Sequence, residues 1–533
     1  MTDAGVRAIL PAGDRAILVE LDSLAAVLSL QAALQAHPLA GQLDVVAAAS
    51  TVLVTAATSD AARTIAAHVR TLDLSQRPEI DAALVAIDVV YDGEDLAAVG
   101  ELTGLGAEGV VAAHTGSVWT AAFGGFAPGF TYLAGGDPRL EVPRRATPRT
   151  AVPAGAVALG GAYSAVYPRP TPGGWQLIGR TDAVLWDLDR DSPALVRPGN
   201  RVQFNAVRAT ALAPSAAAAA TSAPESPAAG TAAAGTAPGL AVVRSGLQST
   251  IQDLGRPGSA DLGVTTSGAM DRGALRQANR LAGNPAGAAG IEVLHGGLAL
   301  AALADQVLAV AGAPVDLAIT DVDGGEREVP MLAPFALLAG ETLELGVPQS
   351  GLRSYVAVRG GLDAPLILGS RSTDTMSGIG PAPLAPGALL GVLEAAPWSV
   401  VGNPELAAAE APEVTELRMV PGPRQDWFDD AVVAGFGGQE WTVTPQSNRI
   451  GLRLSGTALE RNRDGELASE GTVRGAIQVP PSGQPVLFLS DHPVTGGYPV
   501  IGVVATVDLD KAAQLPPGAR VRFVPDTSAA SAL

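Results

Sequence analysis

The sequence predicts a mainly β fold preceded by a small α+β unit, on three observations. From about residue 81 to 207 the chain breaks into brief apolar runs separated by Gly and Pro, which is typical of a barrel or sandwich of short strands. Three sequence pieces recur in the same order near the end of the chain, which indicates one supersecondary unit used twice. Near the start, two stretches of helical spacing lie beside short apolar strands, as expected of an α+β unit.

The first of these units spans residues 1–80. Short apolar strands are predicted over 8–10 and 16–21, around a turn at Gly13-Asp14, and residues 45–55 are also β-like. A helix is predicted over 24–36, ending before Pro38. Ser59-Asp60 is a capping pair, and it predicts a second helix that continues to Leu72.

The rest of the chain divides at a stretch of unusual composition. Residues 81–208 begin with a predicted strand over 83–91 and two short helices near 95–100 and 107–114, and short strands follow. Residues 209–240 are almost entirely Ala, Pro, Ser, Thr and Gly, which predicts a flexible linker that buries no core. Residues 241–410 and 411–533 are predicted as the two parts of a second module.

The clearest pattern is the glycine- and proline-rich stretch over 475–499, which places Asp491 and His492 between two apolar runs. Its sequence Gly496-Gly497-Tyr498 parallels Gly173-Gly174-Trp175 upstream, and each copy ends in a similar strand near 198–204 and 517–523. Hairpin signals also recur by chance in β-rich chains. Glycine pairs suit backbone that must approach a ligand closely or adopt positive φ.

Composition excludes several classes of protein. The 533 residues carry a formal charge of −19, which disfavours nucleic acid and acidic membranes as partners. There is no cysteine, and Lys511 is the only lysine, so a P-loop, a Schiff-base lysine, a disulfide and covalently bound biotin are not expected. The N-terminus lacks the pattern of a signal peptide and no apolar run reaches membrane length, so we expect a cytoplasmic protein.

Long motifs in both parts of the chain resemble a known pair of bacterial proteins. His114, residues 124–133, 143–150 and 173–181 resemble the B subunit of 5-oxoprolinase, and residues 252–258, 267–271, 369–373 and 447–454 resemble its C subunit. The two proteins, normally separate, stand here fused in the order B then C. The same modules resemble the carboxyltransferase part of biotin-dependent urea carboxylase. The chain departs from the family pattern at 162–164, at Asn448 and Ile450, and at the run that begins with His492.

The resemblance implies cyclophilin-like β-barrels with a small N-terminal α+β domain. The implied activity is ATP-dependent opening of 5-oxoproline to L-glutamate, together with a separate A subunit, and the implied cofactors are ATP and Mg²⁺. A carboxyltransferase that acts on urea or another amide with a separate biotin carrier is the alternative. A third possibility is a regulatory binding protein, because relatives of the B subunit include an inhibitor of a histidine kinase.

Opening an unreactive lactam requires its amide to be activated, and arginines in glycine-rich loops suit the binding of phosphate and the stabilisation of the transferring group. Asp491 follows a predicted buried strand, where a carboxylate can bind magnesium, act as a base or cap the turn. The candidate catalytic residues are Asp491, His114, Arg145 and Glu470. His114 and Glu470 have structural alternatives, as a buried histidine and as a cap.

The candidate contacts to substrate or nucleotide are Pro128, Gly129, Phe130, Arg144, Arg149, Gly173, Gly174, Trp175, Arg180, Asp253, Arg256, Arg371, Ser372, Thr373, Arg449, Gln478, Thr495, Gly496, Gly497 and Tyr498. The structural alternatives are a solvated loop for the arginines near 144–149, an ion pair at the barrel rim for Arg180, and a local ion pair for Asp253 with Arg256. Because each half carries one glycine turn next to an aromatic residue, we expect the halves to meet across these turns and share one site.

Overall fold

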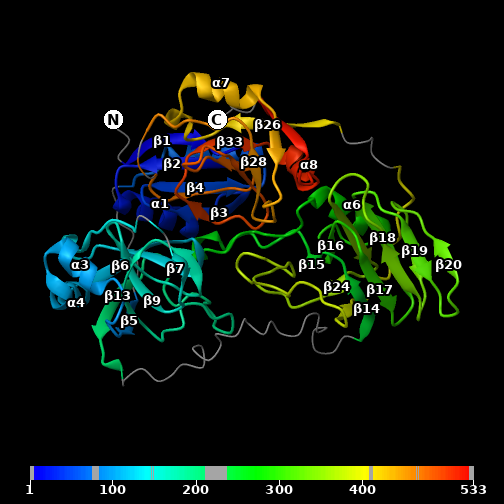
Figure 1. Ribbon diagram of the computed structural model, residues 1–533, viewed down its shortest axis with the longest axis horizontal. Coiled ribbons are helices and arrows are strands. Elements are labelled where there is room, and N and C mark those ends of the chain that lie inside the picture. Colours follow the sequence, from blue (N-terminus) through cyan, green and yellow to red (C-terminus); the bar gives the residue numbers. More distant parts are fainter. Residues whose placement is uncertain are drawn as a thin grey trace.

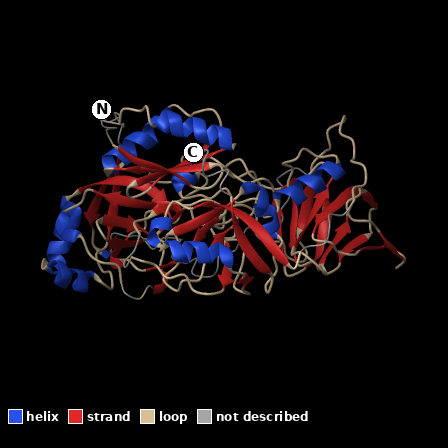
Figure 2. Cartoon of the chain, turned by 90° about the horizontal axis from the view of Figure 1, so that it is seen from above, coloured by secondary structure: helices blue, strands red, loops and turns tan. Residues whose placement is uncertain are grey.

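A computed structural model describes residues 5–74, 83–145, 147, 149–209, 237–406, 412–463, 465 and 467–526. Strands dominate the fold and short helices lie along its outer faces (Figure 2), which confirms the predicted mainly β class. The first and last parts of the chain lie together, with a strand-rich unit on either side of them (Figure 1). The predicted linker lies mostly outside the described residues.

The N-terminal unit is a four-stranded antiparallel sheet in the order β1-β2-β4-β3. Its elements are β1 (Val6–Pro11), β2 (Ala16–Leu21), α1 (Leu24–Ala36), β3 (Gln42–Ala47), β4 (Thr51–Ala56) and α2 (Ser59–Val69). Helix α1 has the predicted bounds, and the Ser23 hydroxyl caps it. The predicted strand over 45–55 is instead the hairpin of β3 and β4. Helix α2 is capped by Thr58 and ends before the predicted Leu72.

The next unit is an open seven-stranded sheet in the order β12-β9-β10-β7-β6-β13-β5. An isolated bridge between Val90 and Arg180, with backbone hydrogen bonds from the Gly93 and Asp95 amides to β12, joins its two edges, so it forms a nearly closed half-barrel. Its elements are β5 (Leu84–Val89), α3 (Leu96–Thr103), α4 (Gly106–Gly116), β6 (Val118–Gly125), β7 (Ala127–Ala134), β8 (Arg149–Val152), β9 (Ala156–Gly160), β10 (Tyr163–Val166), β11 (Thr171–Gly173), β12 (Gln176–Arg180) and β13 (Arg201–Ala206).

Residues 237–406 form two sheets, of seven and five strands, that share one apolar core. The elements are β14 (Pro238–Ser245), β15 (Gln248–Gln252), η3 (Ala260–Leu262), α6 (Arg272–Ala282), β16 (Gly290–Leu294), β17 (Leu298–Ala302), β18 (Gln306–Gly312), β19 (Leu317–Thr320), β20 (Glu326–Glu328), β21 (Phe335–Leu337), β22 (Thr342–Leu345), β23 (Arg353–Val358), β24 (Leu362–Asp363) and β25 (Leu389–Val392). This part is therefore a sandwich rather than a barrel.

The last unit is a closed seven-stranded barrel, β26-β33-β30-β31-β28-β27-β34. Its elements are β26 (Val414–Pro421), α7 (Asp430–Gly438), β27 (Trp441–Val443), β28 (Gly451–Ser455), β29 (Glu470–Gly471), β30 (Ala476–Gln478), β31 (Val486–Phe488), β32 (Thr495–Gly496), β33 (Val500–Val504), α8 (Leu509–Ala513) and β34 (Arg520–Pro525). The predicted buried strand of the 475–499 stretch is β31.

The topology confirms the internal repeat. Starting from β33, the closed barrel has the order β33-β30-β31-β28-β27-β34-β26, which matches the half-barrel strand for strand. Each copy has one parallel pair, β5 with β13 and β26 with β34. Each also places its glycine turn on a separate two-stranded ribbon, β8 with β11 and β29 with β32. One supersecondary unit is therefore used twice.

The two halves of the chain pack directly on each other. One face of the N-terminal sheet carries α1 and α2, and its other face joins an apolar cluster with Ala260 and Val494 of the second half. In addition, the Phe126 amide donates a hydrogen bond to Thr495 Oγ1 at 3.1 Å. Thr495 directly precedes the second glycine turn, Gly496-Gly497, but Phe126 lies in the β6–β7 turn and not in the first glycine turn, Gly173-Gly174. The second glycine turn therefore lies at the contact between the halves, as expected, whereas its partner there is not the first glycine turn.

Among the described residues, no single helix is long and apolar enough to cross a membrane. The helices α3 and α4 reach that length and apolar composition only when they are taken together, and they are bent by 89° at the break between them.

Candidate functional site

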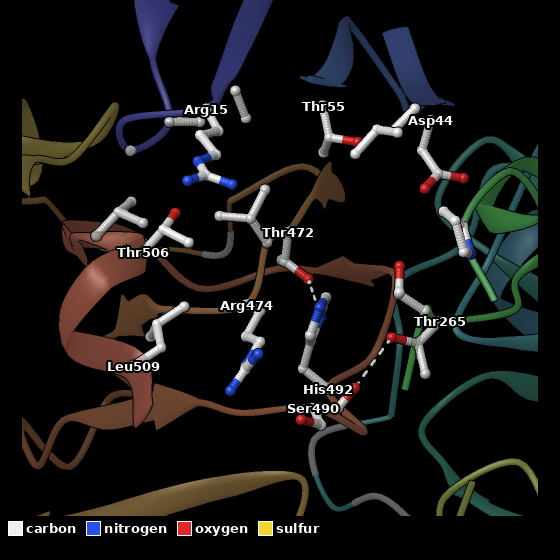
Figure 3. A pocket seen from close by; sticks show the side chains of 18 of the residues that line it. Arg15, Asp44, Thr55, Thr265, Thr472, Arg474, Ser490, His492, Thr506 and Leu509 are labelled. Atoms are coloured by element: carbon white, nitrogen blue, oxygen red, sulfur yellow. Dashed lines mark hydrogen bonds between the residues drawn. The ribbon is translucent and has the colours of Figure 1, made fainter. Parts of the chain in front are cut away.

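A cavity of about 480 Å³ lies where the N-terminal sheet, the segment before α6 and the closed barrel meet. Its walls come from residues 12–16 of the β1–β2 turn, from β3 and β4, from residues 254–266, from Arg272 and Arg276 of α6, and from residues 472–474, 490–494 and 503–510. Figure 3 shows Arg15 across the cavity from Arg474 and His492. Because the walls belong to both halves of the chain, neither half alone encloses this space.

Two arginines in the lining, Arg272 and Arg474, have no acidic partner within ion-pair distance among the described residues. Arg272 donates to the Ser267 carbonyl at 3.3 Å, and Arg474 donates to the Met270 carbonyl. The Nε of each is buried and has no hydrogen-bond partner in the described part of the chain. Burial, followed by the charges of Arg474 and Arg276, lowers the pKa of Arg272 to about 9. Its cation is therefore poorly compensated.

The three acids in the lining are engaged by other groups. Asp510 accepts hydrogen bonds of 3.0 and 3.1 Å from the first two backbone amides of α6. Asp14 accepts one of 2.8 Å from the Thr506 hydroxyl. Asp44 accepts one of 2.8 Å from the Gly258 amide. Each carboxylate therefore stabilises a local turn or a contact between the halves.

His492 is the histidine of the cavity wall. Its Nδ1 lies 2.8 Å from the Pro493 carbonyl oxygen, which can only accept, so Nδ1 carries a proton. Burial lowers the pKa of His492 to about 4. The ring is therefore neutral near pH 7, and Nε2 keeps a free lone pair, since no described group bonds to it. His492 supplies the cavity with a hydrogen-bond acceptor.

Asp491 points away from the cavity, although Ser490 and His492 on either side of it are part of the wall. Its carboxylate is fully buried and accepts from Arg449 Nε at 2.8 Å, from Arg449 Nη2 at 2.9 Å and from the Ser267 hydroxyl at 2.6 Å. Burial alone would raise its pKa, but the charge and hydrogen bonds of Arg449 outweigh burial and hold that pKa below its usual range. The predicted catalytic Asp491 is placed as the centre of an ion-pair network.

This network joins the closed barrel to the sandwich. Arg449 also pairs with Glu292 of β16, which accepts from the Tyr355 hydroxyl at 2.7 Å and lies 3.6 Å from Arg353. Arg449, predicted as a substrate contact, is 3 % exposed and saturated by these acids. Its placement is that of a structural cross-link.

The predicted pair Asp253 and Arg256 bind the 370–373 segment rather than each other. Asp253 accepts from the Ser370 hydroxyl and the Arg371 amide, both at 2.6 Å, and Arg256 donates to the Ser372 carbonyl. The Thr373 carbonyl of the same segment accepts from Gln252 and Ser267, so the predicted residues Arg371, Ser372 and Thr373 lie together beside this network.

The predicted arginines of the half-barrel also have partners. Arg145 and Arg149 lie 2.7 and 2.9 Å from Asp95 Oδ1. The Arg144 guanidinium lies over the Trp175 ring, 6.0 Å from its centroid. Arg180 forms an exposed ion pair with Asp92 at 2.9 Å. This pair is the structural alternative for Arg180 that the sequence analysis gave.

The other predicted residues of this half are part of its packing. Pro128, Gly129 and Phe130 are buried in β7, and Phe130 contacts the Trp175 ring edge to face at 5.8 Å. A Cβ at Gly173 would lie 2.4 Å from the Tyr167 hydroxyl, so only glycine fits there. The Gly174 carbonyl accepts from the Arg145 amide at 2.7 Å, which fixes the turn.

His114 lies in the core of the half-barrel and has no exposed surface. Its ring nitrogens lie 2.7 Å from the Tyr91 hydroxyl and 2.8 Å from the Ser164 hydroxyl. The repeat explains this position. Trp119 Nε1 donates to the His114 carbonyl, just as Trp441 Nε1 donates to that of Phe436, so His114 occupies the place of a core phenylalanine. This placement supports the structural alternative.

Around the second glycine turn, Glu470 pairs with Arg424, which also binds Glu20 of the N-terminal unit. Gln478 Nε2 donates to the Tyr498 carbonyl at 3.1 Å. Gly496 pairs with Glu470 in the β29–β32 ribbon, Gly497 follows it, and the Tyr498 side chain is 41 % exposed. None of the residues proposed from sequence is among those that line the cavity.

Sequence reasoning missed Arg15, Arg272, Arg474 and His492 as cavity residues. Two of them had a local signal, because Arg272 follows the 267–271 motif directly and Arg474 precedes the 475–499 stretch. The described residues contain no group of three His, Asp or Glu side chains that could hold a metal ion. The arrangement instead offers guanidinium donors to an anion and one neutral imidazole acceptor.

Comparisons with known proteins agree with this organisation. The family model described as carboxyltransferase domain, subdomain C and D, matches residues 7–196, and that of subdomain A and B matches residues 262–525. Over 293 residues the chain is 39% identical to the C subunit of 5-oxoprolinase from Escherichia coli, which covers 54% of this chain and 90% of that protein. Over 133 residues it is 41% identical to the B subunit of 5-oxoprolinase from another Escherichia coli strain, covering 24% of this chain and 61% of that protein.

Two further relatives extend the comparison. The crystal structure of TTHA0988 is similar over 96% of this chain and 99% of that one, with a TM-score of 0.84 and 33% identity. Urea amidolyase of Saccharomyces cerevisiae is 31% identical over 311 residues, which cover 54% of this chain and 16% of that protein.

Proposed function

Because this chain belongs to the carboxyltransferase-domain family and joins the parts related to the B and C subunits of 5-oxoprolinase, we propose that it is the fused B–C component of an ATP-dependent 5-oxoprolinase. It would open 5-oxoproline to L-glutamate together with a separate A subunit. The observation that carries this proposal is the cavity, whose walls come from both the B-like and the C-like part. The finer assignment of cyclophilin-like barrels to the two repeats belongs to the same proposal.

The chemistry of the lining suits this reaction. Transfer of a phosphoryl group to the lactam oxygen would activate the amide, and negative charge accumulates on oxygen as it proceeds. The guanidiniums of Arg272 and Arg474 line this partly buried space without an acidic partner among the described residues, so their positive charge can stabilise such an oxygen. ATP would supply the phosphoryl group. Mg²⁺ would be bound mainly by the phosphates, as magnesium usually is in such sites.

The test is reconstitution. The purified chain is mixed with the A subunit of 5-oxoprolinase, ATP, Mg²⁺ and 5-oxoproline, and the release of glutamate and phosphate is followed. We expect turnover only with both proteins present. Each half, expressed separately and cut within residues 210–236, should give little turnover alone and recover it when mixed. No turnover by the complete mixture would refute the proposal.

A carboxyltransferase function is the second candidate, and the similarity to urea amidolyase over 54% of the chain favours it. It predicts transfer of a carboxyl group from carboxybiotin to urea or another amide, with the biotin on another chain. The same protein assayed with a biotinylated carrier, biotin carboxylase, bicarbonate and urea separates the two functions. ATP consumption that depends on biotin and urea, without glutamate formation from 5-oxoproline, would favour the carboxyltransferase.

A further inference from the structure

We propose that Arg272 and Arg474 form an oxyanion subsite in the cavity, which holds a carboxylate or phosphoryl group of the ligand. The inference deepens the proposed function, on which it rests for the identity of the probes. It names the chemical group by which the cavity would select its ligand.

The first argument is uncompensated charge. A partly buried guanidinium is normally paired with an acid, because an isolated buried cation is costly. Arg272 and Arg474 each donate one side-chain hydrogen bond, to a backbone carbonyl, and the Nε of each lacks a partner within the described residues. Of the other buried arginines of this region, Arg449 and Arg424 are paired with two acids each, whereas Arg256, outside the cavity lining, bonds to the Ser372 carbonyl. Arg272 and Arg474 lack such an acid and border a cavity, where an anionic ligand would supply one.

The second argument is that the neighbouring groups do not supply this anion. The negative charge of Asp510 lowers the free-energy cost of burying the Arg272 and Arg474 cations. Its two oxygens, however, accept hydrogen bonds from the first two backbone amides of α6 and do not pair with either guanidinium. Asp14 accepts from Thr506 and also lies 3.9 Å from Arg15. Arg15 and Arg276 add positive charge at the rim.

The third argument is geometric. Arg272 begins α6 of the sandwich and Arg474 precedes β30 of the barrel, so the two cations come from different units and face one cavity. Figure 3 shows Arg474 and His492 side by side, with Arg15 opposite. Two guanidiniums that approach from different elements can hold the several oxygens of a carboxylate or phosphoryl group, each through its planar fork. Beside them, the Nε2 lone pair of the neutral His492 ring can accept a hydrogen bond from a ligand N–H.

The test is direct binding by the full chain, measured by calorimetry and by the ligand-induced shift of the melting temperature. The probes are 5-oxoproline, its uncharged ring analogue pyrrolidinone, inorganic phosphate and ATP. The variants are Arg272→Gln and Arg474→Gln. Arg474→Lys keeps the charge without the fork, and Arg280→Gln, outside the cavity lining, is the control for loss of one exposed charge on the same helix. Melting without ligand shows whether each variant folds.

We expect 5-oxoproline to bind at least about tenfold more tightly than pyrrolidinone, because a charge-assisted pair contributes that much. Arg272→Gln and Arg474→Gln should each lower the affinity about tenfold or more, and Arg280→Gln less than about threefold. If phosphate or ATP binds instead, with the same dependence on the two arginines, the subsite stands and its oxyanion is a phosphoryl group. Unchanged affinity in both glutamine variants, or no binding of any probe, overturns the subsite.

Turnover separates this inference from the proposed function. Arginine-dependent binding without turnover in the presence of the A subunit would leave the subsite and refute the function. Turnover by wild type that both glutamine variants retain in full would leave the function and refute the subsite.

Discussion

Replacement of Asp491 by Asn should destabilise the second half of the chain strongly. The carboxylate accepts two hydrogen bonds from Arg449 and one each from the Ser267 hydroxyl, the Thr375 amide and the Thr375 hydroxyl. Asparagine has nearly the same volume but no charge, and its NH₂ group would face donors. Arg449 would remain buried against Glu292 alone.

The size of the effect follows from burial. Removing one partner of a buried ion pair costs about 3–5 kcal/mol, because the remaining charge is left uncompensated. For a unit of 150–250 residues, 1 kcal/mol shifts the melting temperature by about 2–4 °C, so the variant should melt roughly 6–20 °C below wild type. The matched control is Asp426→Asn, which breaks the ion pair of Asp426 with Arg463. The side chains of Asp426 and Arg463 are 50% and 52% exposed. That change should cost at most about 1 kcal/mol.

The assay is scanning calorimetry together with urea unfolding at pH 7. The pKa of Asp491 lies below its usual range, so its contribution to stability is present above the unfolded pKa and is lost as the pH falls through the folded one. The difference between wild type and variant should therefore shrink in acid. A double variant that also carries Arg449→Met should lose less than the sum of the single changes. A melting temperature within about a degree of wild type would refute the assignment of Asp491 as the centre of the network.

Three further predictions concern other buried positions. Burial lowers the pKa of His114 to about 3, so the wild-type protein should lose stability as the pH falls from about 6.5 towards 3. Urea unfolding at pH 7 and pH 5 should show a smaller loss of stability for His114→Phe than for wild type. An equal loss in both proteins would contradict the buried neutral ring. Burial, followed by the charge of Asp510, raises the pKa of Asp271 to about 6, so wild-type stability should fall as the pH rises from about 4 to 6. In the same assay, Asp271→Asn should remove this fall in stability. A Cβ at Gly125 would lie 2.4 Å from Thr495 Oγ1, so Gly125→Ala should destabilise by about 1–3 kcal/mol in thermal unfolding, whereas Gly116→Ala, with open space around it, should be nearly neutral.

The parts of the fold that local patterns determine could be predicted from the sequence. Helix α1 has the predicted bounds because its cap and its apolar spacing lie within one short stretch. The repeat was visible because its three pieces keep their order, and the barrels keep the same strand order. The sandwich over 237–406 was not predicted as such, because short strands with turn signals fit either architecture.

The cavity was beyond sequence reasoning for a different reason. Arg15, Arg272 and Arg474 lie hundreds of residues apart and meet only through the packing of three units. Near position 491 the sequence pointed to the right segment but the wrong residue. Ser490 and Asp491 form a turn after β31, so strand alternation does not predict where the side chains of Asp491 and His492 point. Tertiary contacts decide it: His492 lines the cavity and Asp491 binds Arg449.

The two copies of the repeat show how one scaffold yields a single asymmetric cavity. In the half-barrel ribbon Gly173 pairs with Arg149, and in the closed barrel Gly496 pairs with Glu470, so Arg149 and Glu470 occupy equivalent positions. Arg149 turns back to Asp95 within its own barrel. Glu470 instead holds Arg424, which reaches Glu20 of the N-terminal sheet and fixes that sheet over the second copy. The N-terminal sheet packs on both copies, but only Glu470 binds an arginine that reaches it, and the cavity of about 480 Å³ lies at the closed barrel with the N-terminal sheet as one of its walls.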